Sequence, residues 1–166
     1  MNPVAPQRRA AIRHRQQLTS EIRGLLRQLR IQLALLNHRI GAQIELRDVD
    51  LDCLDLITLH GPLSPSELAR RAGFHPATMT GILDRLERGR WATRERDPAD
   101  RRAVLVRALN DRNADLMRLY APMSNSMNAI CAGYADSELE LLADFLRRTT
   151  NAGQDATSKL SGSDKN

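Results

Sequence analysis

The chain contains few aromatic residues, few cysteines and almost no lysine. Phe, Trp and Tyr make up 3% of the 166 residues, so we expect any ligand pocket to be lined mainly by aliphatic side chains. Cys53 and Cys131 are too few and too far apart in sequence for a disulfide framework. Both fall in apolar helical segments, where a buried, inert thiol is the usual state and a redox sensor the less common one. We therefore expect a reduced, cytoplasmic protein.

Long apolar runs and catalytic motifs are also missing. No stretch approaches the roughly eighteen apolar residues of a membrane span, and the basic N-terminus has no apolar segment typical of a signal peptide. The chain has no phosphate-binding glycine loop, HExxH, CxxC or nucleophile elbow. Three of its histidines, His14, His38 and His60, lack the close spacing of metal ligands. We predict that the chain is not an enzyme, needs no cofactor or metal, and does not enter a membrane.

Arginine dominates the charge of the chain. The net charge is +5 and the isoelectric point about 10.0, which favours a polyanionic partner such as nucleic acid. Twenty-three arginines accompany only two lysines, and the segment from Gly61 to Ala108 holds ten arginines against six acidic residues. This local surplus points to residues 61–108 as the part that meets the polyanion.

Helical periodicity surrounds that segment on both sides. Residues 1–15 carry two prolines and little apolar content, and we expect a flexible basic arm. In residues 16–47 the apolar positions recur at steps of three and four, which predicts one long helix that buries its stripe against a partner subunit. Residues 110–150 are expected to form further dimerisation helices, with a proline that kinks or divides the first, and residues 151–166 a disordered tail. The predicted dimerisation residues are Leu18, Ile22, Leu25, Leu29, Leu139, Leu142 and Leu146.

Residues 48–109 show the local signals of a helix-turn-helix. A helix from Asp48 to His60 precedes a capping box at Ser64-Pro65-Ser66-Glu67, which starts a second, short helix. Gly73 ends that helix, and His75-Pro76 starts another that runs to about Gly89. Two short helices joined by a glycine-containing turn are typical of a DNA-reading helix pair.

A β-hairpin is predicted directly after this helix pair. Trp91–Arg96 and Ala103–Val106 have strand character, and Asp97-Pro98-Ala99-Asp100 is turn chemistry. The fold class expected is mainly α with a small β-hairpin wing (α+β), in which a winged helix-turn-helix is flanked by long dimerisation helices.

Two surfaces of this unit suit duplex DNA. The last helix of the pair presents small residues and hydroxyls at its N-terminal end, which suits a major groove, and arginines at a hairpin tip suit the narrow minor groove. Asp97 or Asp100 is expected to hold an arginine by a bidentate pair. The candidate DNA-binding residues are Ser64, Ser66, Pro76, Ala77, Thr78, Thr80, Gly81, Arg85, Arg94, Arg96, Asp100, Arg101 and Arg102.

These residues resemble the winged helix-turn-helix of the MarR family of bacterial transcriptional regulators. The resemblance covers about a third of the chain and rests on GPLSPSELARRAG, Pro-x-Thr-x-Thr at Pro76–Thr80, LDRLERGRW and the wing sequence DPADRR. It implies a homodimer that reads a palindrome, with Arg101 or Arg102 in the minor groove and Asp100 bracing the wing. His75 replaces a common serine cap, and Gly81 replaces a side chain that often contacts DNA.

The resemblance further implies a small aromatic or apolar effector, whose identity the sequence does not disclose. The function expected is therefore a dimeric, sequence-specific regulator of transcription that binds double-stranded DNA, a ligand-responsive repressor at a palindromic operator. The alternative is a winged-helix interaction module that binds protein or structured RNA without operator specificity.

Overall fold

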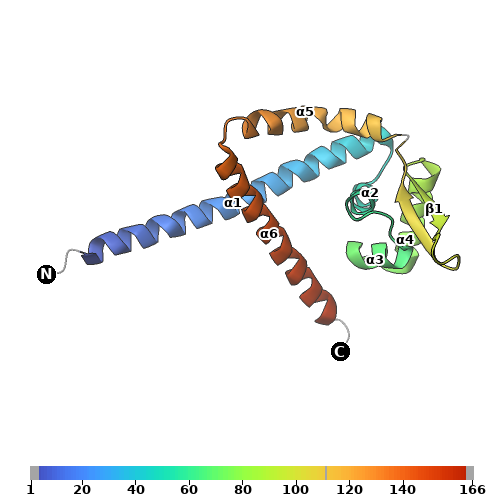
Figure 1. Cartoon of the computed structure of the whole chain (residues 1–166), viewed down its shortest axis with the longest axis horizontal. Coiled ribbons are helices and arrows are strands. Elements are labelled where there is room, and N and C mark those ends of the chain that lie inside the picture. The colour runs from blue at the N-terminus through green and yellow to red at the C-terminus, as the bar shows by residue number, and fades with distance from the viewer. Residues whose placement is uncertain (1–3, 111, 164–166) are drawn as a thin grey trace. The chain divides into compact units, whose positions relative to one another are not determined.

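The computed structural model describes residues 4–110 and 112–163, which form six helices and one β-hairpin (Figure 1). The predicted arm and tail extend to residues 1–3 and 164–166, which lie outside the described residues. The chain folds as two units, of which the first ends at Leu51 and the second begins at Asp52. The elements, in order, are α1 (Val4–Ile44), α2 (Asp48–His60), α3 (Pro65–Ala72), α4 (Pro76–Arg88), β1 (Ala92–Arg96), β2 (Val104–Ala108), α5 (Asn113–Cys131) and α6 (Asp136–Ser163).

The long helix α1 ends in a left-handed turn rather than at a glycine. Glu45 adopts φ 60°, and the Leu46 amide donates to the Gly41 carbonyl at 2.9 Å, which closes the last turn of the helix. Gly41 is needed there for a different reason, because a Cβ on it would lie 2.6 Å from the Leu46 carbonyl oxygen. The end of α1 at Ile44 lies within the predicted range of residues 16–47.

Both chain ends are more helical than predicted. Residues 4–15, expected as a flexible arm, are the first turns of α1, and residues 151–163, expected as a disordered tail, are the last turns of α6. Helix propagation adds one hydrogen bond for each residue ordered, so an established helix extends readily through polar residues. Pro6 is tolerated because it lies in the first turn of α1.

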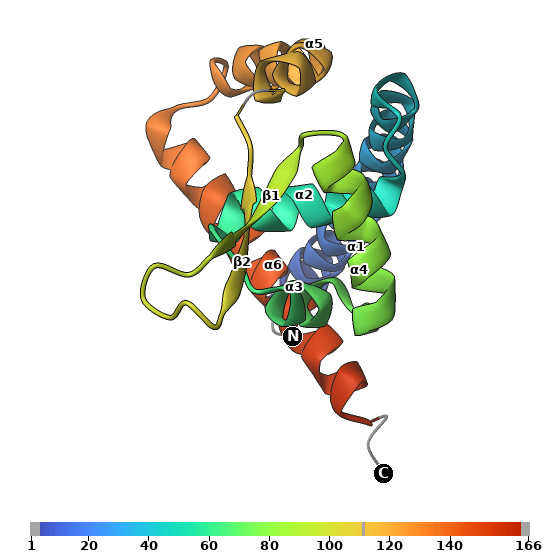
Figure 2. The same cartoon turned by 90° about the vertical axis from the view of Figure 1, so that its right-hand side faces the viewer.

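The second unit contains the predicted winged helix-turn-helix. Its core is formed by side chains that are at most 5% exposed: Leu54, Ile57, Leu68, Met79, Ile82, Leu83, Leu86, Trp91 and Val106. β1 and β2 pair in antiparallel register with Arg94 opposite Val106, and Leu63 bridges the other side of β2. We call α2 to β2 the winged lobe. Figure 2 shows the hairpin loop extending beyond the body of this lobe. The predicted fold class is confirmed.

The C-terminal helices leave much apolar surface uncovered. α5 continues as a single helix through Pro122, so the proline does not divide it. On α6, Leu142 and Leu146 are 42% and 51% exposed. Within the described part of the chain, no helix is both long and apolar enough to span a membrane.

Candidate nucleic-acid interface

The first helix of the pair is capped as its sequence predicts. The Ser64 hydroxyl oxygen accepts the Glu67 amide at 3.1 Å, and Gly73 ends α3 with φ 71°. The Glu67 carboxylate pairs with Arg70 at 2.6 Å and with Arg71 at 2.7 Å. The hydrogen bond from Arg70 is the main cause that lowers the pKa of Glu67 below its ordinary value. Two serines were predicted as DNA-binding residues. Ser64 caps α3 with its hydroxyl, whereas Ser66 is exposed.

The second helix, α4, begins with an imidazole in the place where serine is common. His75 has extended backbone geometry, φ −65° and ψ 144°, and its Nδ1 accepts the Ala77 amide at 3.2 Å. A neutral ring nitrogen thus performs the function of a serine hydroxyl. Because Pro76 follows, the helix direction is set within one residue of the cap.

The N-terminal face of α4 is open and carries small side chains. Its exposed members are Pro76, Ala77, Thr78 and Thr80. The Thr80 hydroxyl donates to the Pro76 carbonyl at 3.2 Å, which leaves its lone pairs and its methyl group for an outside partner. Where Gly81 lacks a side chain, the nearest atom to an added Cβ is Nη1 of Arg85 at 3.8 Å, so the arginine lies beside the glycine.

Arg94 of β1 fastens the wing to α4. Its Nη2 lies 2.9 Å from the Asp84 carboxylate and 3.4 Å from the Thr80 carbonyl, and its Nη1 pairs with Glu87. Glu87 also accepts the Arg94 amide at 2.8 Å. The Arg94 side chain is only 27% exposed, so its donors face α4. Arg94 was predicted as a DNA contact, and the structure places it as a link between the two candidate DNA-contacting elements.

The wing tip is held by aspartates that accept backbone amides. The Asp97 carboxylate accepts the Ala99 amide at 2.8 Å, and that of Asp100 accepts the Arg102 amide at 3.0 Å. The bidentate aspartate–arginine pair expected here is not found among the described residues, because the tight turn points backbone N–H groups at these carboxylates first. Asp100 therefore braces the tip through the main chain.

The tip arginines remain available to an outside partner. Arg101 and Arg102 are exposed. Arg96 reaches back to the Arg101 carbonyl at 3.5 Å, which supports the loop from the strand side. The hairpin therefore carries positive charge at its end while its base is fixed to α4.

Three functional relationships were missed in the sequence. Asp84 and Glu87 had no assigned role, although their spacing of three residues places them on one face of α4. His75 was read as a departure from a serine cap, although an imidazole nitrogen can accept a hydrogen bond. The contact between Arg112 and Trp91 had no local signal, because 21 residues separate them.

Features of other site types are sparse in the described chain. Cys53 is buried, Cys131 is partly exposed, and both are free thiols. No group of three or more His, Cys, Asp or Glu among these residues is arranged to hold a metal ion.

A capped helix pair, a wing fastened to its second helix and an arginine-bearing tip define a winged helix-turn-helix of the DNA-binding type. A family model described as MarR matches residues 46–104. The HTH-type transcriptional repressor NicR of Pseudomonas putida is 30% identical over 82% of this chain and 89% of its own length. The HTH-type transcriptional regulator YcgE of Bacillus subtilis is 29% identical over 82% and 88%.

The fold agrees with a solved structure of a DNA complex. The structure is that of a MepR variant from S. aureus bound to an oligodeoxyribonucleotide. The match covers 77% of this chain and 94% of the MepR chain, with a TM-score of 0.52 at 16% identity. The chain belongs to the MarR family of transcriptional regulators. The members it matches are regulators of transcription, and the chain is accordingly not an enzyme.

Proposed function

We propose that this regulator binds double-stranded DNA as a homodimer and represses transcription from a palindromic operator. The observation that carries the proposal is the exposed N-terminal face of α4 beside a wing whose arginine tip is exposed. Neither surface alone would be enough to infer DNA binding, since short helices and charged hairpins are common in proteins. Their attachment through Arg94 makes them a single surface.

The α4 face suits the major groove. Pro76, Ala77 and Thr78 are small and exposed, so the helix backbone can approach base edges closely, and the threonine can contact a base or a phosphate. Because Gly81 offers no side chain, we expect part of the specificity to come from DNA shape rather than base contacts. The positive end of the α4 helix dipole also favours a phosphate near the helix start.

The wing suits the minor groove. Arginine enters a narrow, strongly negative groove more readily than lysine, and Arg101 and Arg102 stand exposed at the tip. The oligonucleotide complex of a MepR variant, which shares the fold, supports DNA as the ligand.

A homodimer would cover the apolar stripes of α1 and α6. Four stripe residues of α1, Leu18, Ile22, Leu25 and Leu29, are 46%, 41%, 54% and 40% exposed. Contiguous exposed apolar residues on two helices are typical of a subunit interface. A dimer would space two α4 helices about 34 Å apart, one turn of duplex. The dimer would act in the cytoplasm. A small aromatic or apolar effector that binds best to a conformation with a different spacing between the two α4 helices would lower the DNA affinity.

Fluorescence anisotropy with two labelled duplexes tests the proposal. The first duplex is the region upstream of the protein's own gene, and the second is its scrambled sequence at equal length and composition. At physiological salt we expect at least about 1000-fold tighter binding to the first. Arg101→Ala with Arg102→Ala should remove most of that binding. Equal affinity for the two duplexes would reject operator recognition and favour an interaction module for protein or RNA.

A further inference from the structure

Residues 8–30 of α1 carry more unbalanced positive charge than the wing. Residues 8–30 contain seven arginines and one acidic residue, Glu21. All seven arginines lie on a continuous helix and are exposed: Arg8, Arg9, Arg13, Arg15, Arg23, Arg27 and Arg30. We call this set the arginine face. None of the predicted DNA-binding residues belongs to it.

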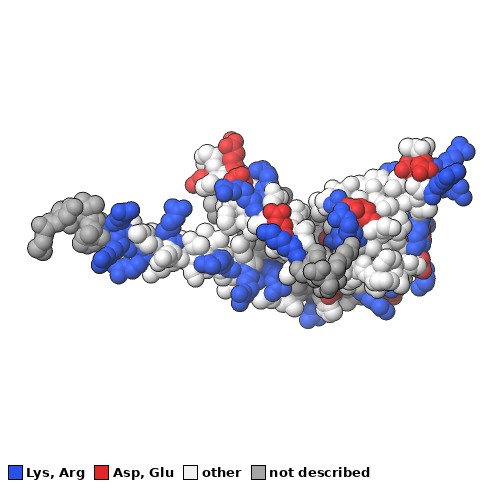
Figure 3. All heavy atoms as spheres, turned by 90° about the horizontal axis from the view of Figure 1, so that it is seen from below, with Lys and Arg blue, Asp and Glu red and all other residues white. Residues whose placement is uncertain are grey.

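Helix geometry places these side chains on one side of α1. At 100° per residue the seven arginines fall within about 160° of the circumference, and Glu21 lies about 80° outside the edge of that arc. Figure 3 shows blue side chains along this part of α1. Within the described residues, no carboxylate forms an ion pair with any of the seven. The arginine face therefore has no internal neutralisation.

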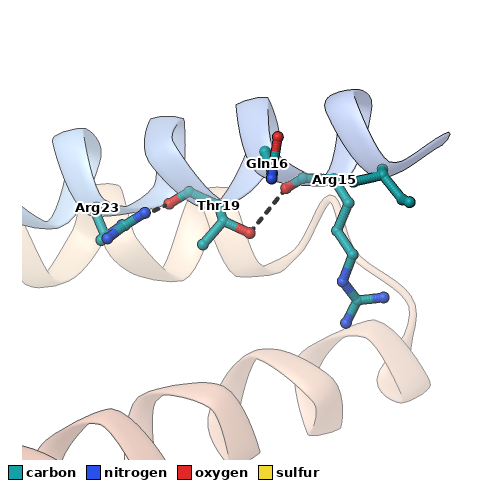
Figure 4. Close-up of a pocket in the computed structure, with 5 residues that line it drawn as sticks. Arg15, Gln16, Thr19 and Arg23 are labelled. Carbon is teal, nitrogen blue, oxygen red and sulfur yellow. Dashed lines mark hydrogen bonds between the residues drawn. The ribbon is translucent and has the colours of Figure 1, made fainter. Parts of the chain in front are cut away.

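The local contacts leave the guanidinium groups accessible. Figure 4 shows the Arg15 side chain extending away from the helix. Arg23 donates from Nε to the Thr19 carbonyl at 3.4 Å, which orders its stem and leaves the terminal nitrogens. Arg15, Thr19 and Arg23 also line a shallow hollow with Ile12 and Gln16. A planar guanidinium beside a hollow can bind two phosphate oxygens at once.

We propose that the arginine face is a second DNA-binding surface, which holds the phosphate backbone of duplex DNA independently of the winged lobe. From Arg8 to Arg30 the helix rises about 33 Å, close to one turn of duplex at 3.4 Å per base pair. The face can thus follow about one turn of backbone. Phosphate contacts carry no sequence information, so it adds affinity to every sequence equally. The inference rests on the proposed function, because it concerns the same ligand.

An anionic membrane fits α1 less well. Helices that lie on membranes bury Trp, Phe or Leu beside their basic face, and α1 offers leucines but no Trp or Phe. The apolar stripe of α1 also continues into residues that the protein itself buries, since Ile40 is 3% exposed.

The test removes four charges from the arginine face and an equal number elsewhere. The arm variant combines Arg8→Gln, Arg9→Gln, Arg13→Gln and Arg15→Gln, since glutamine and arginine have similar helix propensity. The control lowers the net charge by the same four units as the arm variant, but on α5 and α6. It combines Arg118→Gln, Arg147→Gln, Arg148→Gln and Lys159→Gln. Circular dichroism verifies that both full-length variants keep their helix content.

Anisotropy titrations from about 50 to 200 mM salt give the slope of log affinity against log salt concentration for each protein. The arm variant should lower the magnitude of the slope by about two to four, about 0.9 for each lost contact, and should weaken operator and scrambled duplex by the same factor. The control should change the slope by less than one. If the slope of the arm variant equals that of the wild type, the inference is overturned. If the wild type instead binds the operator and the scrambled duplex equally well, the proposed function is rejected.

Two further measurements test whether the arginine face binds a second copy of the chain or a membrane instead of DNA. If the arm variant raises the dimer dissociation constant in sedimentation equilibrium and leaves the slope unchanged, the arginines pair with acidic residues of a second copy and the inference is overturned. The same holds if the wild type, but not the arm variant, sediments with phosphatidylserine vesicles at physiological salt while the DNA slopes agree.

Discussion

The guanidinium of Arg112 lies over the indole of Trp91, with its central carbon 4.2 Å from the ring centroid. The same group donates from Nη1 to the Gly89 carbonyl at 3.0 Å. Gly89 is required beside this pair, because a Cβ there would lie 2.6 Å from Cδ1 of the indole. Trp91 is 1% exposed, so the contact joins the segment before α5 to the buried end of the winged lobe.

Replacing Arg112 with alanine should therefore destabilise the winged lobe. A cation–π contact and one hydrogen bond are lost, which together are worth about 1–3 kcal/mol. Trp91 is the only tryptophan, so its emission in a urea titration reports on this site directly. Arg118→Ala is the matched control, since Arg118 is 78% exposed. Equal urea midpoints for Arg112→Ala and wild type would contradict the prediction.

Arg94 should act on DNA through Asp84 rather than by contact with phosphate. Arg94→Ala frees β1 from α4, and we expect operator affinity to fall about tenfold or more. Asp84→Ala should lower affinity less, because the Arg94–Glu87 pair remains, and the double variant should lose little more than Arg94→Ala, which already removes the Asp84 link. If Arg94 instead bound phosphate, Asp84→Ala would raise affinity and the two effects would add. Anisotropy on the four proteins of this cycle distinguishes the two cases.

The His75 cap should be replaceable by serine and not by alanine. His75→Ser keeps an acceptor for the Ala77 amide and should leave thermal stability nearly unchanged. His75→Ala removes the acceptor and should cost about 1 kcal/mol, together with a loss of DNA affinity as the start of α4 frays. Calorimetry and anisotropy on the two variants check this. A His75→Ala protein as stable as His75→Ser would show that the imidazole does not cap α4.

The apolar stripes should determine the oligomeric state. Leu25→Glu places a charge in the exposed stripe of α1, and Leu146→Glu does so on α6, so each should shift the protein from dimer to monomer. Leu59→Glu is the control, since Leu59 is 77% exposed and belongs to neither stripe. Sedimentation equilibrium at about 10 μM measures the outcome. A monomeric wild type at that concentration, or a dimeric Leu25→Glu variant, would contradict the dimer.

Much of the winged lobe could be predicted because its signals are local. Ser64 caps α3 by accepting an amide three residues away, and Gly73 ends it with a left-handed φ. The observed strands start or end within two residues of the predicted Trp91–Arg96 and Ala103–Val106. Hydrogen bonds that span two to four residues depend on the backbone nearby, so the amino acids at those positions suffice.

The chain ends show where composition misled. Residues 4–15 and 151–163 are polar, yet they are helical, because they extend helices that apolar stripes had already established. Low hydrophobicity predicts that a segment cannot form a core, and it does not prevent such a segment from continuing a helix.

The sequence by itself determined the order of elements, the caps and the charge at the wing tip, because each depends on neighbours along the chain. Only the tertiary structure decided what each charged group does. Arg94 meets Asp84, ten residues away, because the chain turns at Gly89 and brings β1 back along α4. Arg101 and Arg102 stay exposed because the carboxylates of Asp97 and Asp100 are engaged by backbone amides. Among so many arginines, the approach of distant segments separates those that hold the fold from those left to bind DNA.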